Sequence, residues 1–194
     1  GAALRGDVLA AARVEGDSRD DMTRAVALLK SWTRPESTVM LFFGGYGVQS
    51  GRESYMIPVD AAIWREVDVR RQGVSVESVL DAMKEQGARA KLVVVDASRR
   101  NPYERRFRAF SHGLAPISAP DNALILSSAM PGQVVHDSRR QYSVLMTELL
   151  DNLGSKTGIE AAFNNTRAAI ARSAYGARVP AVSSSLLHDV IFRP

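Results

Sequence analysis

The sequence predicts an α/β fold in which helices cover both faces of a mostly parallel central sheet. Short apolar segments of strand length alternate with longer segments whose apolar residues recur at helical spacing, and this alternation is typical of parallel sheets. Residues 92–95 are apolar without alternation, as expected of a strand buried on both faces. The chain has 194 residues, 45% of them hydrophobic, and no cysteine; this length is enough to bury a core without disulfides.

Strands are predicted where short apolar runs are bounded by turn-forming residues. The predicted strands are residues 8–14, 38–43, 91–96 and 123–129. Residues 186–192 form a last apolar run and are predicted as an edge strand.

The first helix is predicted to begin after Ser18, a suitable N-cap, with Asp20 and Asp21 near its positive N-terminal end. The apolar face of this helix is formed by Met22, Ala25, Val26, Leu29 and Trp32.

Three further helices are predicted. The second opens at Ser75 or Ser78, and Gly87 is placed to end it. The later two run over residues 142–153 and 159–174.

Composition and motifs exclude several classes of function. No apolar run approaches the roughly 20 residues of a membrane-spanning helix, so a soluble protein without a membrane partner is expected. The net charge of +4 is too small an excess to indicate nucleic-acid binding. No cofactor or metal is predicted, because phosphate-binding, dinucleotide-binding and calcium-loop motifs are missing and the histidines are widely spaced, at His112, His136 and His188.

Two strand ends carry the residues most suited to chemistry. Residues 44–47, Gly-Gly-Tyr-Gly, follow one predicted strand, and Asp96 and Ser98 stand at the end of another. Ligands of open parallel sheets bind beyond the carboxyl ends of strands, and glycines allow backbone amides to approach a ligand. The alternative interpretations are structural: residues 44–47 form a tight turn, Asp96 is a structural carboxylate, and Ser98 is a loop serine. The Gly-x-Ser-x-Gly motif of ordinary serine hydrolases is missing.

These two segments resemble the paired signatures of a known peptidase family. Residues 42–61 (FFGGYGVQSGRESYMIPVDA) and residues 91–102 (KLVVVDASRRNP) are similar to the two signatures of the caspase-like domain of bacterial orthocaspases, relatives of the metacaspases. The resemblance covers about residues 6–194, although the family's usual first strand is not found before Gly1. It implies a single caspase-like domain over residues 1–194 with a three-layer caspase–hemoglobinase sandwich, p20-like over about 1–110 and p10-like over about 120–194.

The sequence departs from this family at both catalytic positions. Tyr46 stands where the family has its general-base histidine, and Ser98 where it has its cysteine nucleophile. A serine hydroxyl needs a base to act as a nucleophile, and a tyrosine of ordinary pKa is only about 0.1% ionised at pH 7. A catalytically inactive caspase-like domain is therefore expected. The alternatives are a peptidase that uses Ser98 as nucleophile with Tyr46 or His112 as base, and an inactivated variant of an active cysteine peptidase.

The binding apparatus of the family is expected to persist. The resemblance implies an oxyanion hole formed by the backbone amides of Gly47 and Ser98. It also implies that Asp96, together with Asp137, forms an acidic pocket for Arg or Lys, since carboxylates bind guanidinium groups through charge-assisted hydrogen bonds. The expected partner is a protein or basic peptide, and the expected state a monomer. The resemblance implies a bacterial protein, with cytoplasm and periplasm both open.

Overall fold

A computed structural model describes residues 8–15, 17–97, 117–128, 143–153, 157–173 and 179–191. Within these ranges the centre of the molecule is a five-stranded sheet in the order β1-β2-β6-β7-β8. Its strands are β1 (Val8–Glu15), β2 (Thr38–Gly44), β6 (Ala90–Asp96), β7 (Ala123–Ser127) and β8 (Ala181–Ser184). β1, β2, β6 and β7 are parallel, and β8 is antiparallel to β7. The predicted mostly parallel sheet is confirmed.

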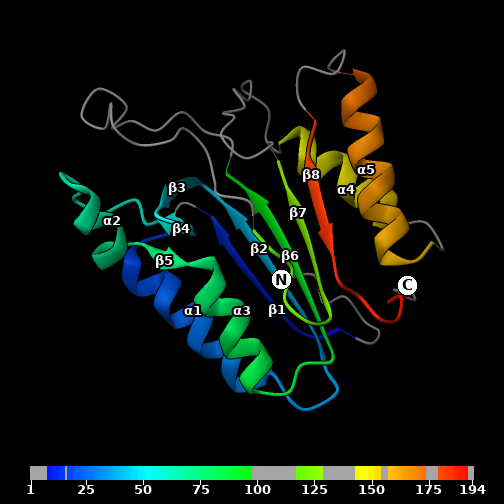
Figure 1. Ribbon diagram of the computed structural model, residues 1–194, viewed down its shortest axis with the longest axis horizontal. Coiled ribbons are helices and arrows are strands. Elements are labelled where there is room, and N and C mark those ends of the chain that lie inside the picture. Colours follow the sequence, from blue (N-terminus) through cyan, green and yellow to red (C-terminus); the bar gives the residue numbers. More distant parts are fainter. Residues whose placement is uncertain are drawn as a thin grey trace.

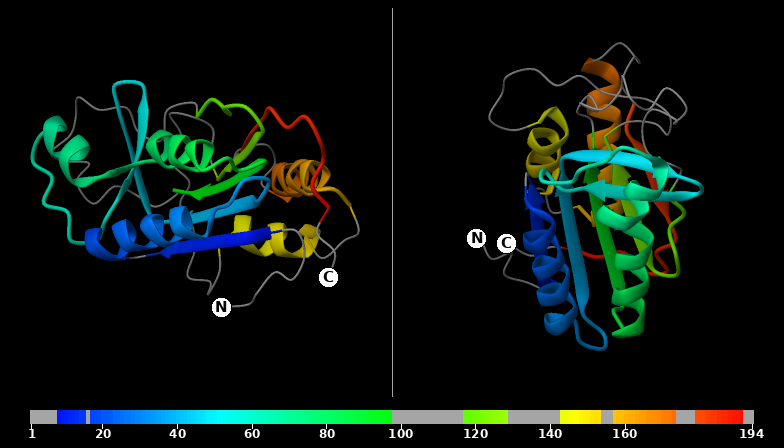
Figure 2. Two further views of the ribbon diagram at one scale, coloured as in Figure 1. Left: turned by 90° about the horizontal axis from the view of Figure 1, so that it is seen from below. Right: turned by 90° about the vertical axis from the view of Figure 1, so that its left-hand side faces the viewer.

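Helices cover both faces of this sheet, which gives three layers (Figure 1; Figure 2). α1 (Arg19–Trp32) and α3 (Val76–Glu85) pack on one face, and α4 (Val144–Leu153) and α5 (Ile159–Ser173) on the other. Because side chains alternate along a strand, β6 serves both cores: Val93 and Val95 face α1 and α3, whereas Leu92 and Val94 face α4 and α5. All four are fully buried, as their unbroken apolar run predicts.

The helix ends lie close to where the capping residues place them. The Ser18 hydroxyl oxygen accepts the Asp21 N–H at 3.2 Å, and the Ser75 hydroxyl oxygen accepts the Ser78 N–H at 3.1 Å, so both are N-caps. α3 ends at Glu85, and Gly87 follows with φ +78°, a left-handed conformation that favours glycine. In the described part of the chain, no helix has the length and apolar character needed to cross a membrane.

A small second sheet projects beside the carboxyl ends of the central strands, in the order β3-β4-β5 (Figure 1). It consists of β3 (Tyr46–Ser50), β4 (Glu53–Ile57) and β5 (Val74–Ser75), with α2 (Glu66–Gln72) against it. Gly51, with φ +64°, turns β3 into β4. The hairpin encloses its own apolar cluster, formed by Val48, Tyr55, Ile57, Ala61, Ile63 and Val69. The sequence analysis predicts neither this sheet nor α2.

The predicted edge strand over residues 186–192 is wrong. The edge strand is β8, which ends at Ser184, and residues 185–191 are not a strand. The Ser185 N–H still donates to the Ala123 carbonyl at 2.9 Å, but the chain then turns toward α5. There the Val190 carbonyl accepts the Ile159 N–H at 2.8 Å. Within this run Val190, which is 4% exposed, and Leu186 pack on the core that includes α4 and α5, whereas Leu187 and Ile191 are exposed.

Candidate functional site

The two strand ends singled out by the sequence lie side by side. β2 and β6 are neighbours in parallel register, so Gly44 stands opposite Asp96 at the carboxyl edge. One step further, the Gly45 N–H donates to the Asp96 carbonyl oxygen at 3.2 Å. The glycine-rich segment and the Asp96 segment therefore meet at this edge. Asp96 is only 7% exposed, and a buried carboxylate has to be hydrogen-bonded or paired.

The glycine at position 45 is needed for space. Among the described residues, the glycines with positive φ are Gly51 and Gly87, and neither belongs to the 44–47 segment. A Cβ at Gly45 would lie 3.0 Å from Cζ of Phe43, a side chain that is 2% exposed in the core. A close approach of the Phe43 ring, rather than a left-handed backbone, therefore demands glycine at position 45.

Tyr46 opens the hairpin. It begins β3 opposite Ile57, and Gly47 stands opposite Met56. The Tyr46 side chain is half-buried and packs against the apolar cluster of the hairpin. The phenol ring therefore rests on apolar side chains. Within the described ranges, the Tyr46 hydroxyl group has no hydrogen-bond partner.

A small cavity of about 30 Å³ lies between this hairpin, α1 and the end of β2, with room for a water molecule or two. It is lined by Asp17, Met22, Phe43, Gly44, Gly45, Tyr46, Ile57 and Val59. Asp17 is the functional candidate that the sequence analysis misses. No local sequence signal marks it, because its place follows from the register of β1 against β2, in which Glu15 stands opposite Gly44. Asp17 therefore follows a third strand that ends at the same edge.

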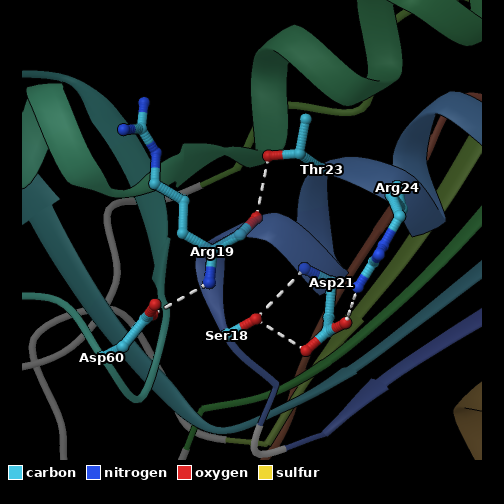
Figure 3. A network of polar contacts seen from close by, with 6 residues as sticks. All are labelled: Ser18, Arg19, Asp21, Thr23, Arg24 and Asp60. Carbon is cyan, nitrogen blue, oxygen red and sulfur yellow. Dashed lines mark hydrogen bonds and ion pairs between the residues drawn. The ribbon is translucent and has the colours of Figure 1, made fainter.

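Two hydrogen bonds join the segments that carry the walls of this cavity. The Val59 N–H donates to the Asp17 carbonyl oxygen at 3.1 Å. The Arg19 N–H, at the first residue of α1, donates to Oδ1 of Asp60 at 2.9 Å (Figure 3). The segment after β4 is therefore fixed to the segment that precedes α1.

The far part of the hairpin is held by carboxylates. Both carboxylate oxygens of Glu77 accept the Ser54 N–H, at 3.1 and 3.2 Å, and so continue the β4–β5 ladder beyond Ser75, where the strand gives way to α3. Burial raises the pKa of Glu77. Asp68 accepts the N–H groups of Trp64 and Arg65, and these hydrogen bonds lower its pKa.

Two predicted site residues, Ser98 and Asp137, lie outside the described residues, as does His112. The pairing of Tyr46 with Ser98, the oxyanion hole at Gly47 and Ser98, and the second pocket acid stay predictions. Of the predicted set, the structure brings together Tyr46, Gly47 and Asp96 at one edge, and adds Asp17 to them.

The mostly parallel five-stranded sheet with helices on both faces is a three-layer α/β sandwich, and two acidic residues stand at its carboxyl edge. The family model described as "Caspase domain" of peptidase family C14 matches residues 12–191, and the chain belongs to this family. Comparison with curated proteins returns no match.

Proposed function

We propose that this chain is a catalytically inactive caspase-like domain that binds a basic segment of a protein or peptide without cleaving it. The observation that carries the proposal is the placement of two acidic residues at the carboxyl edge of the sheet: Asp17 follows β1, and Asp96 ends β6. A small cavity lined by Asp17 and Tyr46 lies at the same edge. An acidic residue therefore stands on each side of Gly44 at this edge.

The acidic residues support a basic ligand. Asp17 follows β1, Asp96 ends β6, and β2 with Gly44 lies between these two strands. The planar guanidinium of arginine forms bidentate hydrogen bonds with carboxylates, which gives both affinity and orientation. Since the whole chain carries a net charge of +4, attraction of a basic ligand depends on these local carboxylates.

The setting of Tyr46 supports inactivity. A general base must be within hydrogen-bond reach of the proton it removes and must have a suitable pKa. Tyr46 begins a strand and packs on an apolar cluster, which is a structural setting for an aromatic side chain. Loss of catalytic partners that act as a unit lowers the rate by several powers of ten. The remaining backbone and pocket groups would then bind a ligand without cleaving it.

The experiment is calorimetric titration with a blocked peptide that contains arginine, against the same peptide with citrulline, which keeps the shape and lacks the charge. We expect the arginine peptide to bind more tightly and to be recovered intact by mass spectrometry. Asp17→Asn and Asp96→Asn should each reduce the preference. The matched control is Asp81→Asn, because Asp81 is exposed on α3. Equal binding of both peptides to the unchanged protein would refute the acidic pocket.

A second experiment tests inactivity. We expect no cleavage of arginine or lysine peptides by the protein and restored cleavage in the double variant Tyr46→His/Ser98→Cys. Cleavage by the unchanged protein that disappears in Ser98→Ala would overturn the proposal and make Ser98 a working nucleophile. Silence in both proteins would leave the binding experiment to decide the pocket.

A further inference from the structure

Asp60 lies at a junction between two segments that are distant in sequence and adjacent at the site. Its carboxylate accepts the N–H of Arg19, 41 positions earlier, at 2.9 Å (Figure 3). The residue before it, Val59, donates its N–H to the Asp17 carbonyl at 3.1 Å. Asp17 and Val59 both line the cavity, so this pair of hydrogen bonds joins two of its walls.

We infer that Asp60 is a positioning residue that holds Asp17 in place for recognition of a basic side chain, an inference that rests on the proposed function. Asp60 is exposed and does not line the cavity. It acts through the backbone of Arg19, two residues after Asp17. This hydrogen bond and the Val59–Asp17 hydrogen bond both join the two segments, and removal of the first leaves the second in place.

Helix capping alone does not account for this arrangement. The N-terminus of α1 already has a cap of its own, because Ser18 accepts the Asp21 N–H and its hydroxyl donates to Oδ2 of Asp21 at 2.6 Å (Figure 3). Asp21 is also paired with Arg24. These contacts all lie within the first turns of α1. Asp60, by contrast, belongs to the segment after β4 and accepts a hydrogen bond from the first residue of α1.

Ser18 therefore provides a matched control. Ser18→Ala and Asp60→Ala each remove one side-chain acceptor from the same helix end, and each should lower the midpoint of denaturant unfolding to a similar extent. Only Asp60→Ala removes one of the two hydrogen bonds that join the two walls of the cavity. A purely structural role would make both variants alike in binding; a positioning role would separate them.

The measurement is the ratio of dissociation constants for the citrulline and arginine peptides. We expect Asp60→Ala to lower this ratio by about fivefold, since displaced carboxylates lose the geometry of charge-assisted hydrogen bonds. Ser18→Ala should leave the ratio unchanged. Asp60→Asn keeps an oxygen acceptor but removes the charge, and should retain the preference, which separates positioning from direct attraction by Asp60 itself.

Each outcome decides the inference. An unchanged ratio in Asp60→Ala, with the unchanged protein still preferring arginine, overturns the role of Asp60 and leaves the proposed function standing. Equal losses in Asp60→Ala and Asp60→Asn overturn it as well, because the charge would then be responsible. A protein that shows no preference for arginine refutes the proposed function and this inference together.

Discussion

The backbone N–H of Gly45 donates to the carbonyl oxygen of Asp96 at 3.2 Å, just beyond the last paired residues of β2 and β6. This hydrogen bond extends the contact of the two strands by one residue and sets the point at which the chain turns from β2 into the hairpin. Because this hydrogen bond uses the main chain of Asp96, a substitution of the Asp96 side chain leaves the hydrogen bond in place. The structure of the edge can therefore be tested separately from its charge.

Gly45→Ala should destabilise the fold by about 1–2 kcal/mol, because the added methyl group forces the buried Phe43 ring to move. Denaturant unfolding measures the change. Phe43→Leu provides the test of cause, since in that background the alanine should cost at least 0.5 kcal/mol less, by about the size of typical coupling energies. Additive effects of the two substitutions would contradict the contact.

Gly158→Ala should also destabilise the fold. A Cβ at Gly158 would overlap the carboxylate of Asp189, which accepts the Val190 N–H at 2.9 Å and the Glu160 N–H at 3.4 Å near the start of α5. The expected loss is about 1–3 kcal/mol in denaturant unfolding. In an Asp189→Ala background the same change should cost clearly less, and an undiminished cost would place the conflict elsewhere.

The Tyr55 hydroxyl group should ionise only at a higher pH than an ordinary tyrosine. Burial and the 2.7 Å hydrogen bond from its hydroxyl to Glu53 raise its pKa to about 12. Because the folded pKa exceeds the ordinary value of 10.0, the stabilisation is complete below pH 10 and is lost as the pH rises toward about 12. In an absorbance titration of phenolate, one tyrosine should titrate near pH 12, and Tyr55→Phe should remove this component. Unfolding of Tyr55→Phe should also depend less steeply on pH across that window.

Lys91 should be replaceable by an apolar side chain with a gain in stability. It is 2% exposed on β6, and burial lowers its pKa, with Lys84 adding to the effect and Asp121 opposing it. We expect Lys91→Met to stabilise the protein at neutral pH by about 1 kcal/mol, or roughly 2–4 °C in Tm.

The pH dependence of this gain identifies its cause. A lowered lysine pKa destabilises the folded state only while the unfolded chain binds the proton, so the gain should fade as the pH approaches the ordinary value of 10.5. A gain that persists unchanged above that pH would indicate better packing instead. Lys30→Met, at an exposed position paired with Glu85, is the control and should have little effect.

The central strands and their helices were predictable because local signals and burial agree there. The strands ending at Gly44 and Asp96 lie within one residue of their predicted bounds. Each is a short unbroken apolar run, as expected of a strand buried on both faces. The run over residues 186–192 misled because apolar character alone does not distinguish a strand from a segment that packs on helices.

The hairpin and Asp17 were not predictable from the same signals. β3 begins with Tyr46 and Gly47, and its burial is only partial, so no apolar run marks it. Its far end depends on Glu77, 23 positions after Ser54, a tertiary contact that no local pattern reveals. Asp17 needed the register of β1 against β2, which follows from the topology of the sheet rather than from the residues beside it.

The hairpin packs on an apolar cluster separate from the two cores of the central sheet, although Met56 of β4 belongs to the core under α1 and α3. Segments with their own small cluster open as local units at a lower free energy than the whole domain. The amides of residues 46–57 should accordingly exchange with solvent deuterium faster than those of β6. The hairpin that carries Tyr46 would then be able to open locally and adapt to different ligands while the central sheet keeps its structure.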